Sequence, residues 1–526
     1  MNRALIKSRL AAAALTLLAL CACSVNPVTG ERNFQVFDSD WERNVGAQMY
    51  APMRQSQGGD FILDPELSAY VAQVGNRLAA SSRRPGELQY EFSIINDSVP
   101  NAWALPGGKI AINRGLLTAL DSEAELAAVL GHEIVHADAS HGARAQSKAM
   151  LTQTGAVIAM ILGSSIPSQS AREVAMMVPA LGAQLLTQKY GRDAEREADE
   201  YGMLYMSEAG YDPRGAVRLQ ETFVELSEGR QQDWLSGLFA SHPPSPERVA
   251  SNRATAATLP AGGENGTEEF QRRTAYLRRV QPAYEAFDEA NKAVSEEQLG
   301  LGQERLNEAL ALEPRESLFH ALQGDIHALN EKPEQALASY QTAIQANPDL
   351  FFGHLRTGQV AYKLGRPEEA RASLERSQAL LPTAEAHYLL GMLDREAGNL
   401  ESAVAHFREA AGSKSESGQK AVRELVVLDL PANPAKYVGV RVTLDRDNTV
   451  WVQFGNLTPI AIRDIEISYA WLDDQGRTRQ GVERYAGPLP ANEQAQLNLG
   501  FRLNAPSELE RRVRVQVTAA QPVDEG

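Results

Sequence analysis

The sequence is poor in cysteine, in net positive charge and in long apolar segments, and each shortage excludes a class of protein. Its two cysteines, Cys21 and Cys23, lie close together near the N-terminus, so the rest of the chain can form no internal disulfide. The net charge of −16 argues against nucleic acid as a partner, because an acidic surface repels phosphate. After residue 22, no segment reaches the roughly 18 apolar residues of a membrane-spanning helix.

The first 22 residues have the pattern of a secretion signal. Basic residues precede the apolar run LAAAALTLLALCA, which is too short to cross a bilayer. The end of the run, Leu20 to Cys23, resembles the bacterial lipoprotein processing box, which implies cleavage before Cys23 and lipidation of that cysteine. We therefore expect residues 1–22 to be a lipoprotein signal peptide, with plain secretion as the alternative. Ser24 follows the cysteine, which is similar to lipoproteins that reach the outer membrane from the periplasmic side.

The chain is too long for one hydrophobic core, and its pattern changes twice. A segment rich in glycine, proline and polar residues predicts a linker and lead-in helix at 259–280. Beyond it, Pro314, Pro348 and Pro382 recur every 34 residues, which is the period of tetratricopeptide repeats. We expect an all-α repeat solenoid at 281–425, whose concave surface binds an unknown protein partner.

The last hundred residues alternate apolar and polar positions in short runs such as VGVRVTLD and TVWVQFGN. Turn residues separate these runs, which is typical of short antiparallel strands. The pattern predicts a small β-sandwich at 426–526, and none of its residues indicates catalysis.

The stretch VLGHEIVHAD, Val129 to Asp138, contains two of the nine histidines of the chain. Its apolar residues recur at helical spacing, so His132 and His136 lie one turn apart on one helix face and can bind a single tetrahedral ion. Glu133 points about 100° away from His132, where it can take a proton from a metal-bound water without binding the ion itself. Two histidines alone only suggest a metal site, so a third ligand elsewhere in the chain is needed to support it.

Two segments offer a third ligand. His141 lies nine residues after the first histidine, about half a turn out of phase on a continuous helix. Gly142 stands where the metzincin spacing requires histidine, so that class is excluded. In GRDAEREADEYG, Glu195 and Asp199 are four residues apart and share a helix face. Glu195 can complete a two-histidine, one-glutamate zinc site, and Asp199 can hold a histidine N–H. A solvated helix face is the alternative for these charges, and it suits Glu197 better than Glu195.

The pattern H-E-x-x-H followed by E-x-x-A-D-x-x-G resembles the zinc metallopeptidase family that includes HtpX and the CAAX prenyl endopeptidases. Two further segments fit this family: Pro100–Leu117 (PNAWALPGGKIAINRGLL) and Ser241–Val249 (SHPPSPERV). The order of peptidase and repeats is similar to that of a periplasmic member of the family. The resemblance implies a multidomain fold, with an α+β zincin-type metallopeptidase domain at 23–258 before the solenoid and the β-sandwich.

The resemblance also implies roles for residues outside the two motifs. A strand with Asn101, Ala102 and Trp103 lies along the substrate cleft, and Trp103 stands where the family more often has phenylalanine. His242 or Arg248, from the segment that matches the family's HP…R pattern, helps to stabilise the tetrahedral oxyanion.

We therefore expect one Zn²⁺ per chain, held by His132, His136 and Glu195, with Glu133 as the general acid and base. The expected function is a zinc-dependent endopeptidase of the bacterial cell envelope. It would act on protein or peptide substrates, including misassembled envelope proteins that the repeats select. The alternative is an envelope chaperone or assembly scaffold in which proteolysis is secondary or latent, but the complete metal set favours a protease.

The apolar segment at 150–186 lies between the two halves of the predicted site. Its glycine, serine and proline break allows two interpretations: a hairpin that covers the cleft, or plain core helices.

Overall fold

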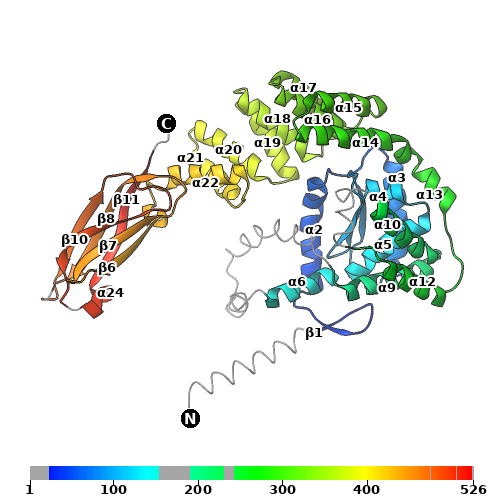
Figure 1. Cartoon of the computed structure of the whole chain (residues 1–526), viewed down its shortest axis with the longest axis horizontal. Helices are drawn as coiled ribbons and strands as arrows, with labels where there is room; N and C mark the ends of the chain where they lie inside the picture. Colours follow the sequence, from blue (N-terminus) through cyan, green and yellow to red (C-terminus); the bar gives the residue numbers. More distant parts are fainter. Residues whose placement is uncertain (1–22, 153–189, 230–241, 474, 505, 524–526) are drawn as a thin grey trace, which may run out of the picture. The chain divides into compact units, whose positions relative to one another are not determined.

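The computed structural model of the protein describes residues 23–152, 190–229, 242–473, 475–504 and 506–523 (Figure 1). The predicted signal peptide and almost all of the apolar segment at 150–186 lie outside the described residues. Within these ranges, no helix is both long and apolar enough to cross a membrane. The chain divides into two compact units, Met1–Gly353 and His354–Gly526.

A small mixed sheet lies between helices in the first unit. Its strand order is β3 (Glu91–Ile95), β5 (Lys109–Asn113), β4 (Ala102–Leu105), with β3 parallel and β4 antiparallel to β5. Successive side chains of a strand point to opposite faces, so one face of the sheet packs on α2 (Ser39–Ser56) and the other on α5 (Glu123–Asp138). Strand β4 is the edge that lies beside α5.

The remaining elements of this part surround the sheet and α5. They are β1 (Cys23–Val25), β2 (Arg32–Phe34), α3 (Pro65–Ala79), α4 (Arg114–Ala119), α6 (His141–Thr152), α9 (Arg192–Glu208), α10 (Arg214–Gly229) and α12 (Pro246–Thr258).

Helix α5 is the central helix of the first unit and is buried on all sides. Its start is set locally, because the Ser122 hydroxyl accepts a hydrogen bond from the Glu125 N–H, and the Glu125 carboxylate accepts one from the Asp121 N–H. It ends before Ser140, which adopts a left-handed conformation (φ 53°) and separates α5 from α6. This break turns the chain just beyond the second histidine of the H-E-x-x-H motif.

Helices α5 and α9 approach each other closely because each has a glycine at the contact. A Cβ added at Gly202 would lie 3.1 Å from the backbone nitrogen of His132, and one added at Gly131 would lie 3.1 Å from the carbonyl oxygen of Gly202. This close approach brings the acidic residues of α9 within reach of the histidines of α5.

The lead-in helix α13 and the first repeat helices belong to the same compact unit as the sheet and α5. These helices are α13 (Thr267–Arg273), α14 (Ala275–Ser295), α15 (Leu299–Leu312), α16 (Ser317–Leu329) and α17 (Pro333–Ala346). Leu277, Tyr284 and Phe319 of this group lie in one continuous core with residues of α3 and α5. The boundary predicted at residue 258 marks the point where the peptidase motifs end in the sequence. The two compact units of the structure meet instead between Gly353 and His354, in the first turn of α18 (Phe351–Lys363).

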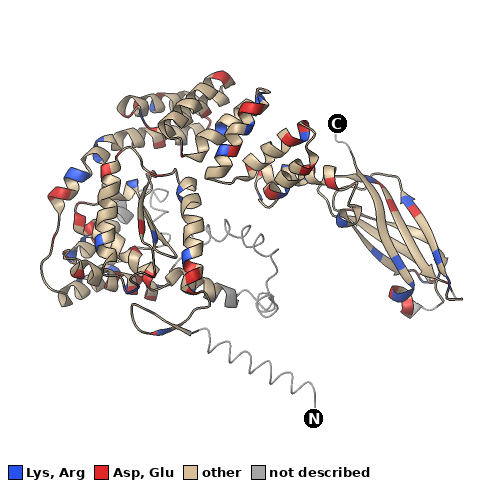
Figure 2. Ribbon diagram, turned by 180° about the vertical axis from the view of Figure 1, so that it is seen from behind, with Lys and Arg blue, Asp and Glu red and all other residues tan. Residues whose placement is uncertain are grey.

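The second unit contains the later repeat helices and a strand domain. Its helices are most of α18, α19 (Pro367–Leu380), α20 (Ala384–Glu396), α21 (Leu400–Ala411), α22 (Glu416–Asp429) and α23 (Pro434–Tyr437). Small residues face large ones between paired helices, as the repeat pattern predicts: a Cβ at Gly391 would lie 2.6 Å from the ring of Phe407. Acidic and basic residues are interspersed along the helices of both units (Figure 2).

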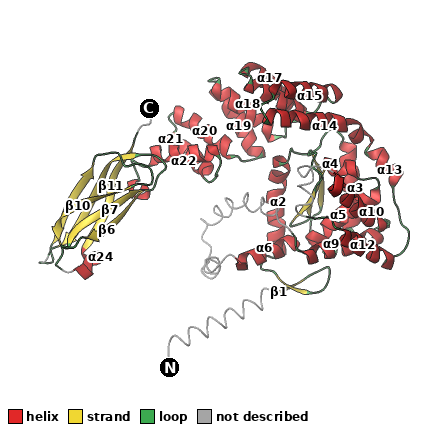
Figure 3. Cartoon of the chain, viewed as in Figure 1, coloured by secondary structure: helices red, strands yellow, loops and turns green. Residues whose placement is uncertain are grey.

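The C-terminal strands form two three-stranded antiparallel sheets with a shared apolar core (Figure 3). One has the order β10 (Gln494–Arg502), β7 (Thr449–Asn456), β6 (Val438–Leu444), and the other β11 (Val513–Pro522), β8 (Ile462–Leu472), β9 (Thr478–Tyr485). A short 3₁₀ turn, η1 (Pro506–Glu508), and α24 (Leu509–Arg512) precede β11. The predicted sequence of an α+β domain, helical repeats and a C-terminal β domain is confirmed.

Candidate metal centre and active site

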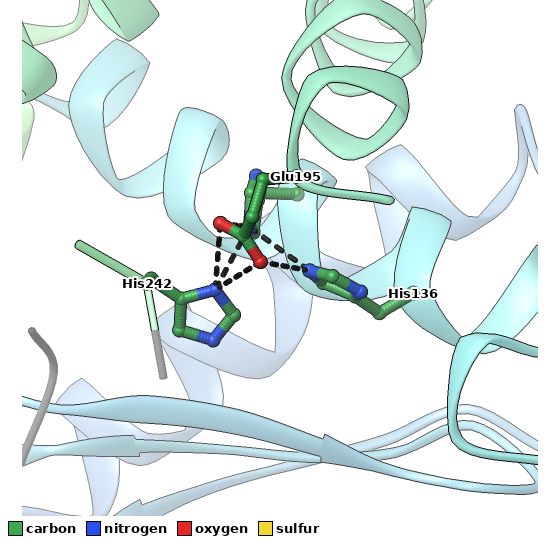
Figure 4. A group of neighbouring side chains, drawn as sticks. His136, Glu195 and His242 are labelled. Atoms are coloured by element: carbon green, nitrogen blue, oxygen red, sulfur yellow. Dashed lines mark hydrogen bonds and ion pairs between the residues drawn. The ribbon is translucent and has the colours of Figure 1, made fainter. Parts of the chain in front are cut away.

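Four side chains from three parts of the first unit converge on one buried point. His132 and His136 come from α5, Glu195 from the first turn of α9, and His242 from the loop before α12. The ligand atoms of this donor cluster all lie within 4.8 Å of one another. Figure 4 shows the Glu195 carboxylate between the rings of His136 and His242.

The distances inside the donor cluster are those of groups that face a common centre. His132 Nε2 lies 3.0 Å from His136 Nε2. One Glu195 oxygen lies 3.6 Å from His132 Nε2, and the other lies 3.5 Å from His136 Nε2. The structure thus brings together the three residues predicted as metal ligands, although they lie up to 63 positions apart in the sequence.

The surroundings of the two histidines make the centre suitable for a cation. His132 Nδ1 donates to Asp199 Oδ1 at 3.0 Å, which turns His132 Nε2 toward the centre. Burial lowers the pKa of His136 well below its usual value and keeps that imidazole neutral. The two Nε2 atoms lie 3.0 Å apart and face the same centre, and two imidazoles with one carboxylate are a typical zinc donor set. The residues therefore fit a metal ion.

Asp199 and Arg248 support the donor cluster from behind. Arg248 donates from Nε and Nη2 to the two oxygens of Asp199, at 2.8 and 2.7 Å, and its Nη1 lies 3.2 Å from Glu195. Burial opposes the negative charge of Asp199, but the hydrogen bonds from His132 and Arg248 outweigh it and lower the pKa of Asp199. In this arrangement Asp199 accepts a hydrogen bond from His132, while the guanidinium of Arg248 contacts the carboxylates of Asp199 and Glu195. In this position Arg248 fixes the ligands, which differs from the predicted contact with an oxyanion.

Glu133 lies next to the donor cluster without joining it. Its carboxylate is 2% exposed, and Glu133 Oε1 lies 3.7 Å from His242 Nε2. Burial raises the pKa of Glu133, although the charges of His242 and His132 act in the opposite direction. A carboxylate with a raised pKa beside a metal centre is suited to receive and return a proton.

His242 takes a different place from the one predicted. Its Nδ1 lies 3.0 Å from Glu195 Oε1 and 3.3 Å from His132 Nε2, so it faces the same centre as the three ligands. Burial lowers the pKa of His242, but the negative charges of Glu195 and Glu133 outweigh burial and raise it. The ring therefore occupies the fourth side of the donor cluster, where the sequence predicted only a residue near the oxyanion.

Two further residues contact His136: His141, which the sequence analysis weighed as a third ligand, and Tyr190, which it did not single out. His141 Nδ1 lies 2.7 Å from His136 Nδ1, and the ring of Tyr190 stacks on His136 with a centroid distance of 4.1 Å. His141 in turn lies 3.5 Å from Glu197, which accepts a hydrogen bond from Asn26 at 2.5 Å. The helix break at Ser140 turns His141 back toward His136. The assumption that His132 and His141 lie on one continuous helix was therefore wrong.

The predicted substrate strand coincides with β4, but its side chains differ in role. Ala102 lines a cavity beside Glu133. Trp103 points to the opposite face of the sheet, where its indole N–H donates to Gln57 Oε1 at 3.2 Å and its ring meets Tyr50 edge-on. The Trp103 side chain therefore packs against α2, on the face of the sheet opposite to Ala102. Asn101 lies just before the strand, and its backbone carbonyl accepts from the Asn113 N–H.

A buried cluster of two histidines and one glutamate, with a second glutamate beside the first histidine, defines a metallopeptidase of the H-E-x-x-H type. Comparison with protein families agrees: residues 65–256 match Peptidase family M48, and residues 287–350 and 355–418 match the tetratricopeptide repeat. The chain thus contains an M48 metallopeptidase domain followed by tetratricopeptide repeats, and the class predicted from the sequence is confirmed.

Curated proteins similar to this chain include several metalloproteases. The mitochondrial metalloendopeptidase OMA1 of Schizosaccharomyces pombe is 32% identical over 42% of this chain and 63% of its own length. The beta-barrel assembly-enhancing protease of Escherichia coli is 26% identical over 68% of this chain and 82% of its own length. The metalloprotease YcaL of Escherichia coli is 28% identical over 44% of this chain and 94% of its own length. A putative beta-barrel assembly-enhancing protease of Vibrio cholerae matches over only 41% of its length, so the chain spans less than two thirds of some relatives.

Proposed function

We propose that the protein is a zinc-dependent endopeptidase of the bacterial cell envelope that acts on periplasmic or outer-membrane proteins. The observation that carries this proposal is the donor cluster with Glu133 directly beside it. A purely structural zinc site has no need for a buried general base beside its ligands, whereas a hydrolytic site requires one.

His132, His136 and Glu195 would hold the ion. Bound zinc supplies a Lewis acid that lowers the pKa of water toward neutrality and stabilises negative charge on a carbonyl oxygen. Glu133 accepts the proton of the attacking water and returns it to the amine that leaves. Burial raises the pKa of Glu133, and a more basic carboxylate is a better acceptor for the proton of water.

The edge strand β4 is suited to hold the peptide. Its outer backbone edge lies beside α5, and a peptide in extended conformation can pair with such an edge through main-chain hydrogen bonds. The small Ala102 side chain leaves room at the cavity, so the backbone of the substrate can approach Glu133.

The position of His242 supports the alternative in which the resting enzyme is latent and proteolysis is secondary. The imidazole faces the side of the donor cluster that a catalytic site leaves open for water and substrate. A movement of the loop before α12 would free that side. We therefore expect His242→Ala to raise the basal rate of cleavage; a lower rate would refute the blocking role and favour a contact of the ring with the oxyanion.

The envelope location rests on the predicted signal and on the names of relatives. Cys23 begins strand β1, and its lipidation would tether the peptidase to a membrane. Relatives named as beta-barrel assembly-enhancing proteases suggest quality control of outer-membrane proteins, with the repeats selecting substrates. The repeats alone would equally suit a chaperone or an assembly scaffold.

The decisive experiment compares wild type with Glu133→Gln in zinc content and in cleavage of an unfolded protein such as casein. Glu133→Gln should retain one zinc per chain and lose about 10²–10⁴-fold in rate, because an amide cannot accept the proton. A chelator should abolish cleavage by the wild type, and added zinc should restore it. His132→Ala together with His136→Ala should lose the zinc, and zinc that persists in that variant would refute the site.

A further inference from the structure

A series of polar contacts leads from the N-terminal hairpin to one of the predicted metal ligands. The hairpin consists of β1, β2 and the turn between them, residues 23–34. In this turn, Asn26 Nδ2 donates a hydrogen bond to Glu197 Oε1 of α9 at 2.5 Å, although the two residues lie 171 positions apart. Glu197 in turn lies 3.5 Å from His141 Nε2, and His141 Nδ1 lies 2.7 Å from His136 Nδ1. We call Asn26, Glu197 and His141 the relay.

The members of the relay are largely buried. Asn26 and His141 are each 3% exposed, and the side chain of Glu197 is 14% exposed. Burial of a carboxylate is costly unless polar or charged groups compensate for the lost water. The compensating groups of Glu197 are Asn26, His141 and Arg144, whose Nη1 lies 3.8 Å away. Glu197 therefore differs from the solvated charge that its place on an amphipathic helix suggested.

The hairpin holds the Asn26 side chain in one orientation. Asn26 Oδ1 accepts a hydrogen bond from the Val28 N–H at 2.9 Å, which is the contact of an Asx turn, and Nδ2 is directed to Glu197. Just after β2, the Val36 N–H donates to the buried Ser147 hydroxyl of α6 at 3.0 Å. The hairpin thus contacts both α9 and α6, beside which it lies (Figure 1).

The contact between the two imidazoles connects the relay to the chemistry of the site. An imidazole that binds zinc through Nε2 carries its proton on Nδ1, so His136 Nδ1 donates and His141 Nδ1 accepts. A neutral His141 ring that accepts at Nδ1 carries its own proton on Nε2, which is the nitrogen that faces Glu197. The Glu197 carboxylate therefore favours the tautomer of His141 that can accept from His136.

We propose, on the basis of the zinc site proposed above, that Asn26 and Glu197 are positioning residues through which the N-terminal hairpin sets the zinc affinity of the donor cluster. Asn26 fixes the position of the Glu197 carboxylate. That carboxylate sets the tautomer and orientation of His141, and His141 orients the ligand His136. Groups that hold the second ring nitrogen of a ligating histidine typically contribute about 10- to 100-fold to metal affinity.

The test measures the zinc dissociation constant of the full-length protein by competition with a chromogenic chelator. Asn26→Asp keeps the oxygen that accepts from Val28 but replaces the donor to Glu197 with a second carboxylate oxygen. The zinc dissociation constant should rise about tenfold, the lower end of the range for groups that support a ligand. Thr29→Ala is the matched control, because it removes an exposed hydrogen bond from the Glu31 N–H within the same turn. It should leave the constant unchanged.

Two double variants separate positioning from general damage to the hairpin. Glu197→Gln added to Asn26→Asp reverses donor and acceptor: the glutamine amide donates to the new carboxylate, and its oxygen accepts from His141. This pair should recover most of the lost zinc affinity. In a His141→Ala background, Asn26→Asp should cause no further loss, because its effect passes through His141 and the two substitutions are then not additive.

The outcomes distinguish this proposal from the zinc site on which it rests. The inference would be overturned by an unchanged constant in Asn26→Asp, or by an equal loss in Thr29→Ala. Failure of Glu197→Gln to rescue Asn26→Asp, or a further loss in the His141→Ala background, would overturn it as well. In all four cases a wild type that binds one zinc per chain leaves the metal site intact. A wild type that binds no zinc would refute both the positioning role and the proposed peptidase.

Discussion

Gly202→Ala should weaken zinc binding even though alanine is the better helix former. The added Cβ would lie 3.1 Å from the His132 nitrogen and 3.2 Å from the carbonyl carbon of Gly131, which is closer than an ordinary contact. Helix α9 must therefore move by a few tenths of an ångström away from α5. Glu195, Asp199 and Gly202 share one face of α9, so this movement carries both carboxylates away from the histidines.

The two effects of the substitution have opposite signs. Helix propensity alone would stabilise the variant by up to about 1 kcal/mol, whereas overpacking at a close helix contact costs about 1–3 kcal/mol. We expect a net destabilisation of up to about 2 kcal/mol. Metal–ligand distances tolerate only about 0.2 Å, and disturbed support of ligands typically lowers metal affinity about 10- to 100-fold. The zinc dissociation constant should therefore rise at least about tenfold.

Zinc affinity is measured by competition with a chromogenic chelator, and stability by thermal unfolding of the zinc-free protein. Gly191→Ala, at the N-cap of the same helix, is the matched control, because a Cβ there would meet no atom within 4 Å. It should leave the zinc affinity unchanged. A Gly202→Ala protein that binds zinc as tightly as wild type and unfolds at a higher temperature would refute the reasoning.

Three further predictions concern the surroundings of the site. His141→Ala should raise the zinc dissociation constant about 10- to 100-fold, because His136 loses the partner of its Nδ1; a chelator competition that gives the wild-type value would contradict this. Asp138→Asn should lower the thermal unfolding temperature, because the fully buried carboxylate accepts hydrogen bonds from Ser82 and Tyr205. Each of these charge-assisted bonds contributes about 1.5–3 kcal/mol. An unchanged unfolding midpoint would show that the amide accepts these bonds equally well. Cys23→Ser should abolish labelling by a clickable palmitate analogue and release the protein from outer membranes, whereas equal absence of label in both proteins would point to simple secretion.

The local sequence pattern was sufficient to predict those helices and strands that depend mainly on neighbours along the chain. The apolar spacing of Leu126, Val129, Leu130 and Ile134 predicted α5, and all four side chains are buried in the structure. The 34-residue period and the alternating C-terminal runs predicted the repeats and the β domain, because each repeat or strand shows the face it buries in its own sequence. Likewise, the helical turn between His132 and His136 requires no tertiary contact.

Tertiary packing decided the roles that depend on residues distant in sequence. Periodicity shows which face of a helix is polar, but it does not show that Arg248 reaches Asp199 or that His242 faces His132. The direction of Trp103 followed from which face of the sheet meets α2, and alternation along a strand leaves that choice open. The partnership of His141 with His136 required a helix break whose left-handed residue, Ser140, carries no distinctive pattern.

The donor types of a metal site can be read from sequence because ligand chemistry and helical spacing are local properties of the chain. Side-chain orientation, burial and the supply of hydrogen-bond partners are not local, since they arise only when α5, α9, α10 and the loop before α12 pack together.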